Sequence, residues 1–475
     1  MTQHLPLIVD LDETLLLTDT LAEGLVGLVL HRPTALPGAV ASLIRGGRPA
    51  LKRFVSAKAD LDLEGLPVRE DLLSYLKSEK ATGRTIVLVT AADQSVADAV
   101  AAHFDLFDAA HGSSGSTNLK GDEKRAYIRQ LFPDGYVYAG DSRADLKVWR
   151  DADGIIFAGP SAHTRKVADG LGKPVEADFP NSGGGLKSWR KALRLHQWAK
   201  NLLLFAPLGL SGRFLEPEAI LLAVAGFLLL GVVASGTYLL NDLLDLSADR
   251  RHKTKRSRPL ASGELSVVHG LLAAPFLILT GLVVGWLIAP WLAVGLACYL
   301  VITIAYSFGL KRVPMLDVFV LATLFTTRIA IGALAIGAHV SEWLMTFSML
   351  FFFSMSLAKR HVEVVEAPAG LRIRGRGYFP EDAPLTLSLG LSSAASAVVI
   401  MILYLAEDAF PSGIYSQPAA LWAAPPLIAL WMMRIWLLAH RGQLDDDPVA
   451  FAVKDRWSLL LGAALLTAFV IATLA

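Results

Sequence analysis

Three aspartates and a run of basic residues follow one another where a long apolar segment ends. Asp242, Asp245 and Asp249 are spaced by three and four residues, so on a helix they would form one acidic stripe. The next ten residues, RRHKTKRSRP, include six Lys or Arg. Carboxylate oxygens are ligands for Mg²⁺, and Lys or Arg side chains bind phosphate oxygens. We therefore predict a site for magnesium and a diphosphate, made by these aspartates together with Asn241, Lys255 and Arg258.

A simpler interpretation of this stretch is a polar helix end followed by a basic anchor loop on the cytoplasmic side. That interpretation accounts for the basic residues, because such loops are common in membrane proteins. It does not account for three carboxylates at the end of an apolar helix, where ionisable groups are energetically expensive. The functional interpretation is therefore preferred.

A second group of polar residues follows short apolar runs in the amino-terminal third of the chain. Asp10 and Asp12 follow the run that starts at Leu5, and Thr90 ends the run TIVLV. A third run precedes Gly140-Asp141-Ser142, with Asp145 behind it. Short apolar runs of this kind are typical of buried parallel strands. Because helical patterns separate them, we predict a parallel α/β sheet with these polar residues at the carboxyl ends of its strands, where such sheets bind ligands.

The order of these motifs resembles the haloacid dehalogenase-type phosphatase superfamily, over roughly residues 5 to 160. DxDxT, a strand ending in Thr, a Lys and GDSxxD follow one another as in that family. The resemblance implies that Asp10 is the nucleophile and that Asp12 is the general acid/base for the leaving alcohol. It also implies that Thr90 hydrogen-bonds the transferring phosphoryl group and that Lys124 neutralises it, with Lys120 as the alternative.

The same resemblance implies a Mg²⁺ site. Asp10, the Asp12 carbonyl and Asp141 would bind the ion, with Asp145 in support, so that two anions can react. A flavodoxin-like domain with incidental acids and a catalytically inactive relative are the alternatives. Residues from about 16 to 80 are interpreted as a small helical cap that excludes water and selects the substrate. The domain is expected to end near residue 175, before a linker at 176–187 that contains PNSGG.

The composition indicates a membrane protein with a soluble part. Of the 475 residues, 53% are hydrophobic and only 18% are charged, and the mean hydropathy is +0.48. A net charge of +1 does not suggest a nucleic-acid partner. The single cysteine, Cys298, cannot form a disulfide within the chain. The start of the sequence does not resemble a signal peptide, so the amino terminus is expected in the cytoplasm.

Nine apolar runs after the α/β region are long enough to suggest an all-α bundle of nine transmembrane helices. Most Lys and Arg lie in alternate loops, which places the soluble domain and the motif loops in the cytoplasm and the carboxyl terminus outside. The inner, cytoplasmic membrane is the expected location. The nine runs are residues 197–213, 217–241, 267–288, 290–308, 314–337, 342–358, 384–405, 418–439 and 457–474.

Nine spans with NDxxDxxxD after the second resemble the UbiA-type intramembrane prenyltransferase superfamily, over roughly residues 188 to 475. A second motif after the fourth span supports the resemblance: Tyr306 to Lys311, with Asp317 six residues further on. In that family two acidic motifs bind Mg²⁺ and a diphosphate, and the isoprenoid chain lies between helices. Many members have paired acids in the second motif, whereas this chain has Asp317 alone as the implied metal ligand there.

Two further segments resemble the decaprenyl-phosphate phosphoribosyltransferase branch of that family. The first is LRLHQWAKN, which ends in Lys200 and Asn201, and the second is KRHVE, which contains Lys359, Arg360 and Glu363. The branch implies that these residues bind substrate. For Lys359 and Arg360, ordinary snorkelling to the membrane interface is an alternative.

These resemblances together imply a bifunctional, Mg²⁺-dependent membrane enzyme. The helical domain would join polyprenyl phosphate to phosphoribosyl pyrophosphate, and the phosphatase domain would remove the 5-phosphate to leave polyprenyl-phosphoryl ribose. One alternative is a prenyltransferase that uses polyprenyl diphosphate and an aromatic or quinone-precursor acceptor, with a separate phosphatase activity. Another is a transporter or scaffold that is not an enzyme. An oligomer is compatible with the sequence.

Overall fold

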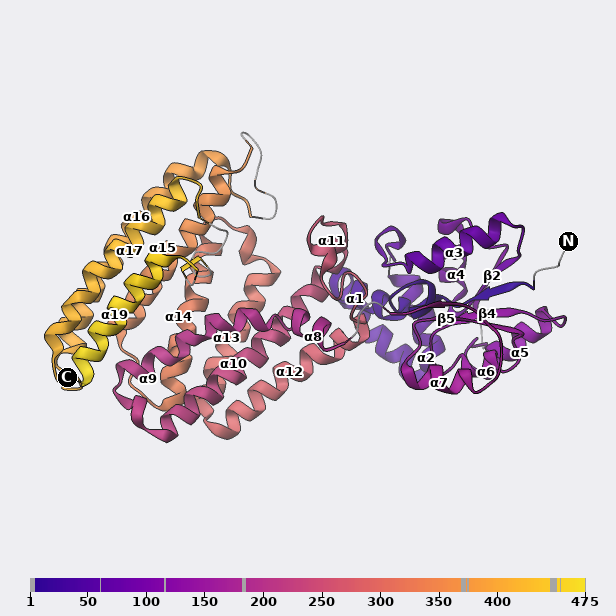
Figure 1. Cartoon of the computed structure of the whole chain (residues 1–475), viewed down its shortest axis with the longest axis horizontal. Coiled ribbons are helices and arrows are strands. Elements are labelled where there is room, and N and C mark those ends of the chain that lie inside the picture. Colours follow the sequence, from indigo (N-terminus) through magenta and orange to yellow (C-terminus); the bar gives the residue numbers. More distant parts are fainter. Residues whose placement is uncertain are drawn as a thin grey trace. The chain divides into compact units, whose positions relative to one another are not determined.

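The computed structural model describes residues 5–59, 61–114, 117–181, 185–368, 373, 376–444, 451–452 and 454–474. The chain divides into two compact units (Figure 1). The first contains Met1–Leu193 and Tyr238–Ala274, and the second contains Arg194–Thr237 and Pro275–Ala475. The acidic segment at residues 241–249 therefore belongs to the same unit as the amino-terminal domain.

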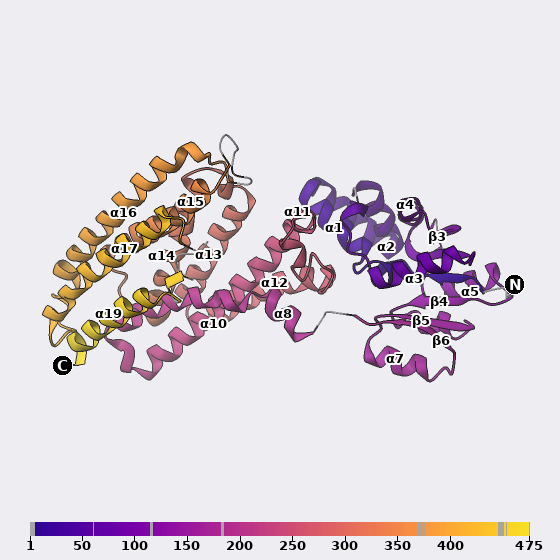
Figure 2. The same cartoon turned by 45° about the horizontal axis from the view of Figure 1, so that its top comes forward.

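A six-stranded parallel sheet forms the centre of the amino-terminal domain (Figure 2). Its order is β3-β2-β1-β4-β5-β6, and all five pairings between neighbours are parallel. The chain moves outward from β1 in one direction and from β4 in the other, so the crevice beside β1 and β4 is the usual place for a ligand. The predicted parallel α/β sheet is confirmed. The strands are β1 Leu7–Val9, β2 Ile86–Asp93, β3 Ala109–Ser113, β4 Val137–Gly140, β5 Gly154–Ala158 and β6 Val175–Phe179.

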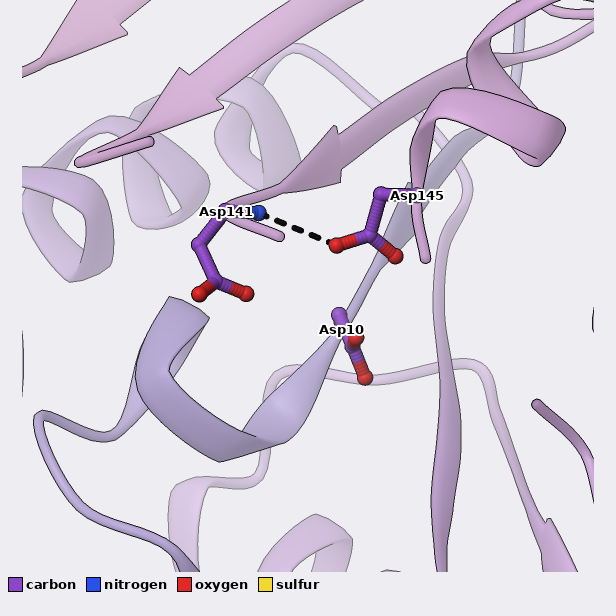
Figure 3. A group of neighbouring side chains, drawn as sticks. All are labelled: Asp10, Asp141 and Asp145. Carbon is purple, nitrogen blue, oxygen red and sulfur yellow. Dashed lines mark hydrogen bonds between the residues drawn. The ribbon is translucent and has the colours of Figure 1, made fainter. Parts of the chain in front are cut away.

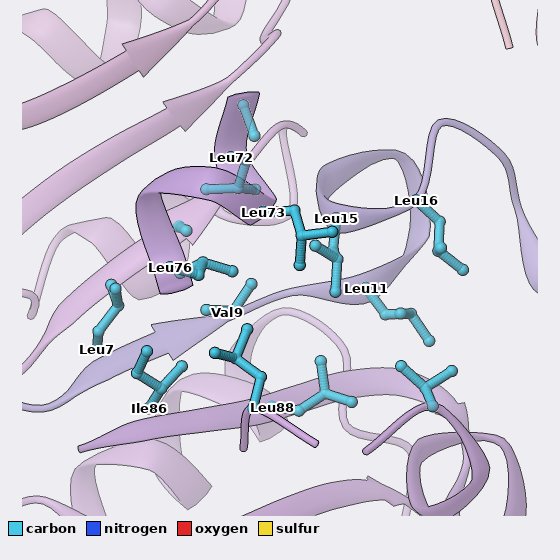
Figure 4. Packing of buried hydrophobic residues seen from close by; sticks show 14 of the residues in the cluster. Leu7, Val9, Leu11, Leu15, Leu16, Leu72, Leu73, Leu76, Ile86 and Leu88 are labelled. Carbon is cyan, nitrogen blue, oxygen red and sulfur yellow. The ribbon is translucent and has the colours of Figure 1, made fainter. Parts of the chain in front are cut away.

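Both faces of this sheet are covered, which explains why its strands are continuous apolar runs. Leu7 and Val9 of β1 pack on one face with Leu76 of α3, Glu70–Ala81 (Figure 4). Ile8 belongs to the cluster on the opposite face, with Trp149. The helices that connect the later strands are α4 Gln94–Phe104, α5 Asp122–Leu131, α6 Leu146–Trp149 and α7 Ala162–Asp169.

A helical insertion separates β1 from β2, in the region where the cap was predicted. It contains α1, Thr20–His31, and α2, Leu36–Lys58, which pack through a small apolar cluster that includes Leu28 and Val55. Gly24 permits this close contact, since a Cβ there would lie 2.4 Å from Val55 Cγ1. Strand β6 extends the sheet to Phe179, beyond the domain end that was expected near residue 175.

The rest of the chain is helical, and seven of its described helices are long and apolar enough to cross a membrane. The protein is thus a multi-pass membrane protein with seven candidate spans. These are Pro217–Leu244, Val267–Ile288, Pro290–Phe308, Leu316–Ile336, Pro380–Ala409, Pro418–His440 and Arg456–Leu474. The corresponding α-helices are α10 Pro217–Leu244, α12 Val267–Ile288, α13 Pro290–Phe308, α14 Leu316–Ile336, α16 Ala383–Tyr404, α17 Ala424–His440 and α19 Arg456–Leu474.

The prediction of nine equivalent spans is therefore wrong for residues 197–213, and one other predicted span is not among the seven. Residues 197–213 form a 3₁₀ segment, Leu195–Phe205, and the short helix α9, Ala206–Leu210, instead of one long helix. Gly332 of α14 accommodates this broken segment, because a Cβ there would lie 2.0 Å from the Leu204 carbonyl oxygen. The other segment, α15, Glu342–Val365, is long enough but is not among the seven. It contains several hydroxyl-bearing residues and ends in charged ones, which lowers its hydropathy.

Candidate functional site

Three carboxylates converge at the carboxyl ends of β1 and β4 (Figure 3). Asp10 follows β1, and Asp141 and Asp145 follow β4. One oxygen atom from each residue lies within 4.8 Å of the others. Oxygen ligands gathered in this way can hold a divalent cation such as Mg²⁺. The parallel topology brings them together, since neighbouring strands end at the same edge.

Asp145 fixes the loop that presents Asp141. Its Oδ2 accepts hydrogen bonds from the Asp141 and Ser142 amides at 3.2 and 2.9 Å and from Ser142 Oγ at 2.7 Å. Its Oδ1 accepts one from the Tyr138 hydroxyl at 2.8 Å. Asp141 in turn accepts a hydrogen bond from Thr14 Oγ1 at 3.0 Å. The last residue of the DxDxT motif thus contacts the GDSxxD motif.

The electrostatics of the cluster fit a bound cation. Burial raises the pKa of Asp10, and the opposing charge of Lys124 offsets only part of the effect. Burial is the main cause that raises the pKa of Asp141 well above its usual range, and the negative charges of Asp145 and Asp10 add to the effect. Both shifts arise because negative charges are kept close together and away from water. A divalent cation would counter this repulsion, so the donor set suits Mg²⁺.

The structure distinguishes the two lysines that the sequence left as alternatives. Lys124 is buried, with Nζ 2.9 Å from Asp10 Oδ1 and 3.0 Å from the Tyr138 hydroxyl. Burial alone would lower the pKa of Lys124, but Asp10 and Asp145 outweigh it and raise the pKa. Lys120 is exposed, although it lines the same pocket. Lys124 is therefore the fixed positive charge beside Asp10.

Asp12 lies where the sheet meets the helical insertion. Its Oδ1 accepts a hydrogen bond from the Thr20 amide at 2.8 Å, at the start of α1. Burial is the main cause that raises the pKa of Asp12 to about 7, and the negative charge of Asp19 adds to the effect. A carboxyl with such a pKa can both give and take a proton near neutral pH, as a general acid/base must.

Lys52 is a pocket residue that the sequence analysis missed. It belongs to α2 of the insertion, and its Nζ donates a hydrogen bond to the Ala91 carbonyl at 2.6 Å. With Asp10, Asp12 and Lys124 it lines a pocket of about 160 Å³. Burial lowers the pKa of Lys52, against the opposing effect of nearby acids that include Asp12. Its sequence environment gave no signal, because the insertion contains several other basic residues.

Thr90 does not line this pocket. Strand β2 continues to Asp93, so Thr90 lies inside the strand rather than at its end. Its side chain is fully buried, and its Oγ1 accepts a hydrogen bond from the Ala92 amide at 3.1 Å. The neighbouring residue Ala91 lines the pocket instead. Thr90 is therefore close in sequence to the pocket but is not one of the residues that line it.

The helix predicted to carry the acidic stripe ends within it. Helix α10 ends at Leu244, and α11, Leu246–Arg251, begins after Asp245, so the continuous stripe is wrong. Asp242 and Asp249 nevertheless face the same guanidinium. Arg258 Nη1 lies 3.1 Å from Asp242 Oδ1 and also pairs with Asp249. These three residues were predicted to form one site, and the structure brings them together.

The residues of this acidic site differ in burial: two of the aspartates are buried, and the basic loop beside them is exposed. Asp242 and Asp249 are buried, and burial raises the pKa of Asp249 although Arg258 opposes the effect. Asp245 Oδ2 accepts a hydrogen bond from Asn241 Nδ2 at 3.1 Å. Lys255 is exposed on the loop that follows.

In the second unit, Asp317 of α14 and Arg360 of α15 form a buried ion pair, with Arg360 Nη2 2.8 Å from Asp317 Oδ2. The hydroxyl of Tyr378, a residue that the sequence analysis missed, donates a hydrogen bond to Asp317 Oδ1 at 2.7 Å. Arg360 also pairs with Glu363, and Lys359 beside it is half-buried. Arg360 is fully buried, so snorkelling does not explain its position.

The remaining residues of the second motif lie around the end of α13. The hydroxyl of Tyr306 accepts a hydrogen bond from Arg376 Nη1 at 2.8 Å. Lys311 is half-buried in the 3₁₀ turn Leu310–Arg312.

A buried arginine that the sequence analysis missed holds the broken segment near Lys200. Arg328 of α14 donates a hydrogen bond through Nε to Asn201 Oδ1 at 3.1 Å and another to the Tyr299 hydroxyl at 3.3 Å. Lys200 Nζ lies 5.9 Å from the centre of the Phe325 ring. An arginine inside an apolar helix was a signal that could have been found, because such residues are costly in a membrane.

Comparison with known proteins assigns the helical part of the chain. Residues 202–472 match the model of the UbiA prenyltransferase family. An uncharacterised Sinorhizobium fredii protein, y4nM, is 44% identical and covers 99% of this chain and 91% of its own length, so the match includes the α/β domain. A decaprenyl-phosphate phosphoribosyltransferase from Mycolicibacterium smegmatis is 32% identical and covers 58% of this chain and 91% of its own length.

A solved structure of an Archaeoglobus fulgidus UbiA homologue, bound to GPP and Mg²⁺, is also similar. It covers 59% of this chain and 99% of its own, with a TM-score of 0.44 and 16% sequence identity. The family model spans more than half of the sequence, and the mycobacterial relative is matched over most of its length. The chain therefore belongs to the UbiA prenyltransferase family.

Proposed function

We propose that this protein is a bifunctional membrane enzyme that makes a lipid-linked ribose. The helical domain transfers 5-phosphoribose from phosphoribosyl pyrophosphate to polyprenyl phosphate, and the α/β domain then removes the 5-phosphate. The observation that carries the transfer is the 32% identity to a decaprenyl-phosphate phosphoribosyltransferase over 91% of that relative. The observation that carries the phosphatase is the pocket in which Asp10, Asp12, Lys124 and the carboxylates after β4 meet.

In the transfer step, an oxygen of polyprenyl phosphate attacks C1 of phosphoribosyl pyrophosphate, and the bond from C1 to the diphosphate breaks. Asp242, Asp245 and Asp249 would hold Mg²⁺, which neutralises the departing diphosphate. Arg258 pairs with Asp242 and Asp249 in the structure, so it is placed to turn to the diphosphate oxygens when a cation takes the carboxylates. Lys255 would add a second positive charge, and Asn241 orients Asp245.

Asp317 and Arg360 form an ion pair that substrate could open in the same way as the pairs of Arg258, with the base binding phosphate and the acid binding the cation. When Arg360 binds a phosphate oxygen, Asp317 is free to act as a further metal ligand, and Tyr378 keeps its carboxylate oriented. Lys311, Tyr306, Lys359 and Glu363 are proposed to complete this substrate-binding group. Lys311 and Lys359 would face the phosphate oxygens, the Tyr306 hydroxyl would hydrogen-bond them, and the Glu363 carboxylate suits a metal ion.

The lipid acceptor has a suitable apolar cavity within the second unit. The cavity has a volume of about 610 Å³ and is lined almost entirely by apolar side chains, among them Leu203, Phe351, Trp431 and Phe469. An isoprenoid chain would bury its methyl and methylene groups against such a wall. Lys200 and Asn201 precede Leu203 on the same broken segment, so we assign them to the phosphate of the acceptor.

In the phosphatase step, an Asp10 oxygen attacks the phosphorus of the 5-phosphate and the ester P–O bond breaks. Asp12 gives its proton to the departing primary alkoxide, and later takes one from the water that hydrolyses the aspartyl-phosphate. Lys124 neutralises the phosphoryl oxygens beside Asp10, and Lys120 at the rim assists binding. Asp10, Asp141 and the Asp12 carbonyl would hold Mg²⁺, which would supply positive charge to reduce the repulsion between the Asp10 carboxylate and the phosphate. Asp145 keeps Asp141 in place, and Thr90 fixes the end of β2 through its hydrogen bond with the Ala92 amide.

The test is to incubate membranes that contain the full chain with polyprenyl phosphate and labelled phosphoribosyl pyrophosphate. Label should enter the lipid phase in a Mg²⁺-dependent manner. Mass spectrometry should then find a lipid that has lost one phosphate and kept its pentose. Free polyprenol or free ribose phosphate would refute the predicted site of hydrolysis. Absence of label, with prenylation of an aromatic acceptor, would favour the alternative prenyltransferase.

A further inference from the structure

A buried ion pair joins helix α1 of the insertion to the segment that follows the acidic motif, and both belong to the first unit. Glu23 Oε1 lies 2.6 Å from Arg250 Nη2, and Glu23 Oε2 accepts a hydrogen bond from Arg250 Nη1 at 3.1 Å. Only 7% of the Glu23 side chain and 6% of the Arg250 side chain are exposed. Both carboxylate oxygens are engaged, which gives the pair a defined geometry.

Neighbouring groups complete the hydrogen bonding of this pair. Thr18 Oγ1 donates a hydrogen bond to Glu23 Oε1 at 2.6 Å. Arg250 Nε donates one to the Ala261 carbonyl at 3.3 Å, so the same guanidinium joins the two ends of the loop from residue 250 to 261. Arg258, which bridges Asp242 and Asp249, lies within this loop. The conformation of the loop and the position of Arg258 are therefore tied to Glu23.

Further contacts surround the pair. Gly263 packs so closely on Leu17 that a Cβ at Gly263 would lie 2.5 Å from the Leu17 Cβ. Ser266 Oγ donates a hydrogen bond at 3.3 Å to Glu13, a residue of the DxDxT motif that also lines the phosphatase pocket. Arg251 pairs with Asp62 at a more exposed position. These contacts extend from the phosphatase motif to the loop that carries Arg258.

We propose that Glu23 and Arg250 are positioning residues for the transferase site. Through their ion pair, the α/β domain holds the loop at residues 250–261 in the conformation that places Arg258 against Asp242 and Asp249. Transfer then depends on the docked α/β domain, even though phosphatase chemistry is not needed for it. This inference rests on the transferase function proposed for the acidic motif. Helix α1 also begins at Thr20, which binds Asp12, so one helix contacts both sites.

The experiment compares Glu23→Gln and Arg250→Gln with the full-length wild-type protein in detergent or nanodiscs. Transfer of label from phosphoribosyl pyrophosphate to lipid should fall by about tenfold or more, since a desolvated charge loses its partner. Hydrolysis of a small soluble phosphomonoester, p-nitrophenyl phosphate, should stay within about twofold, because Glu23 does not contact Asp10 or Lys124. Arg250→Lys should recover part of the transfer, as it restores the charge without the paired geometry.

Limited trypsin digestion measures how firmly the loop at residues 250–261 is held, independently of activity. The sequence RRHKTKRSR in this loop offers several cleavage sites. Cleavage there should be faster in Glu23→Gln and Arg250→Gln than in the wild type. The matched control is Arg251→Gln, which changes an exposed neighbour and should alter transfer and cleavage by less than about twofold. If a single variant does not fold, the exchanged pair Glu23→Arg with Arg250→Glu decides: restored transfer supports the inference, and a folded double variant without transfer overturns it.

The two proposals fail in different ways. If the wild type transfers no label, the proposed function is wrong, whatever the digestion shows. If the wild type transfers label and neither cleavage nor transfer changes in Glu23→Gln and Arg250→Gln, the positioning role is wrong and the function stands.

Discussion

Replacing Asp141 by Asn should stabilise the metal-free protein while removing its response to Mg²⁺. The ligand oxygens of Asp10, Asp141 and Asp145 lie within 4.8 Å of one another. At that separation two unit charges repel by about 3 kcal/mol at an effective dielectric constant of ~20. Protonation already relieves part of this repulsion, since the pKa of Asp141 is raised well above its usual range. We expect the variant to gain about 1–2 kcal/mol in free energy of unfolding, or a few degrees in Tm.

Added Mg²⁺ should stabilise the wild type and leave the stability of Asp141→Asn unchanged. At a concentration one hundred times its Kd, a ligand stabilises the folded state by about 2.7 kcal/mol. The wild type should show a shift of this order, and Asp141→Asn should show none. Asp145→Asn is the matched contrast, because Asp145 accepts four hydrogen bonds from the loop and from Tyr138. It should lose about 1–3 kcal/mol even without metal.

The dependence on pH gives a further check. Because the pKa values of Asp10 and Asp141 are raised from 3.8 in the folded state, the folded protein binds more protons than the unfolded chain above that pH. The stability contributed by these groups is therefore fully present below pH 3.8 and is lost as the pH rises through the raised values. The advantage of Asp141→Asn in metal-free buffer should grow with pH. Thermal unfolding with EDTA or Mg²⁺ measures this. A variant that is less stable than the wild type throughout, or that keeps the Mg²⁺ shift, would refute the assignment.

Variants at three further residues test other parts of the proposal. Asp10→Asn should abolish phosphate release while lipid labelling continues, so that phosphorylated ribosyl lipid accumulates in the mass spectrum; loss of both activities would show that the sites are coupled through chemistry. Asp245→Asn removes a charged ligand and should weaken the metal-bound state by several kcal/mol, so wild-type transfer by a folded variant would place the site elsewhere. Lys52→Met should raise the KM for phosphomonoesters about tenfold, with partial recovery in Lys52→Arg. An unchanged KM would mean that Lys52 only ties α2 to Ala91.

The amino-terminal fold was predictable because its signals are local. A strand buried on both faces must be apolar throughout, and Leu7 to Val9 is such a run followed at once by Asp10. Parallel strands end at the same edge, so the carboxylates after β1 and β4 could be placed together without coordinates. Lys124 could not be separated from Lys120, since the choice depends on burial against Tyr138.

The features that sequence reasoning missed depend on contacts between distant residues. The pairing of Asp317 with Arg360, and the approach of Lys52 to Ala91, arise from packing between separate elements. Hydropathy also counted nine equivalent spans, because a window average does not register a break such as the one at Leu195–Phe205. Gly332 and Arg328 of α14 contact that broken segment. Arg328 stands out in its apolar helix, but its partner Asn201 could not be read from the local sequence.

Paired acids and bases recur at three of the predicted anion sites. Arg258 lies against Asp242 and Asp249, Arg360 against Asp317, and Lys124 against Asp10. In a buried place neither charge can be left alone at low cost, so each must have a partner when no substrate is bound. A magnesium-bound phosphate offers a partner to both members at once, since the cation takes the carboxylate and the phosphate takes the base. The ligand then replaces an existing ion pair instead of meeting an unpaired charge. A cation or a phosphate alone would satisfy only one member, which is why we expect both domains to bind their substrates together with Mg²⁺.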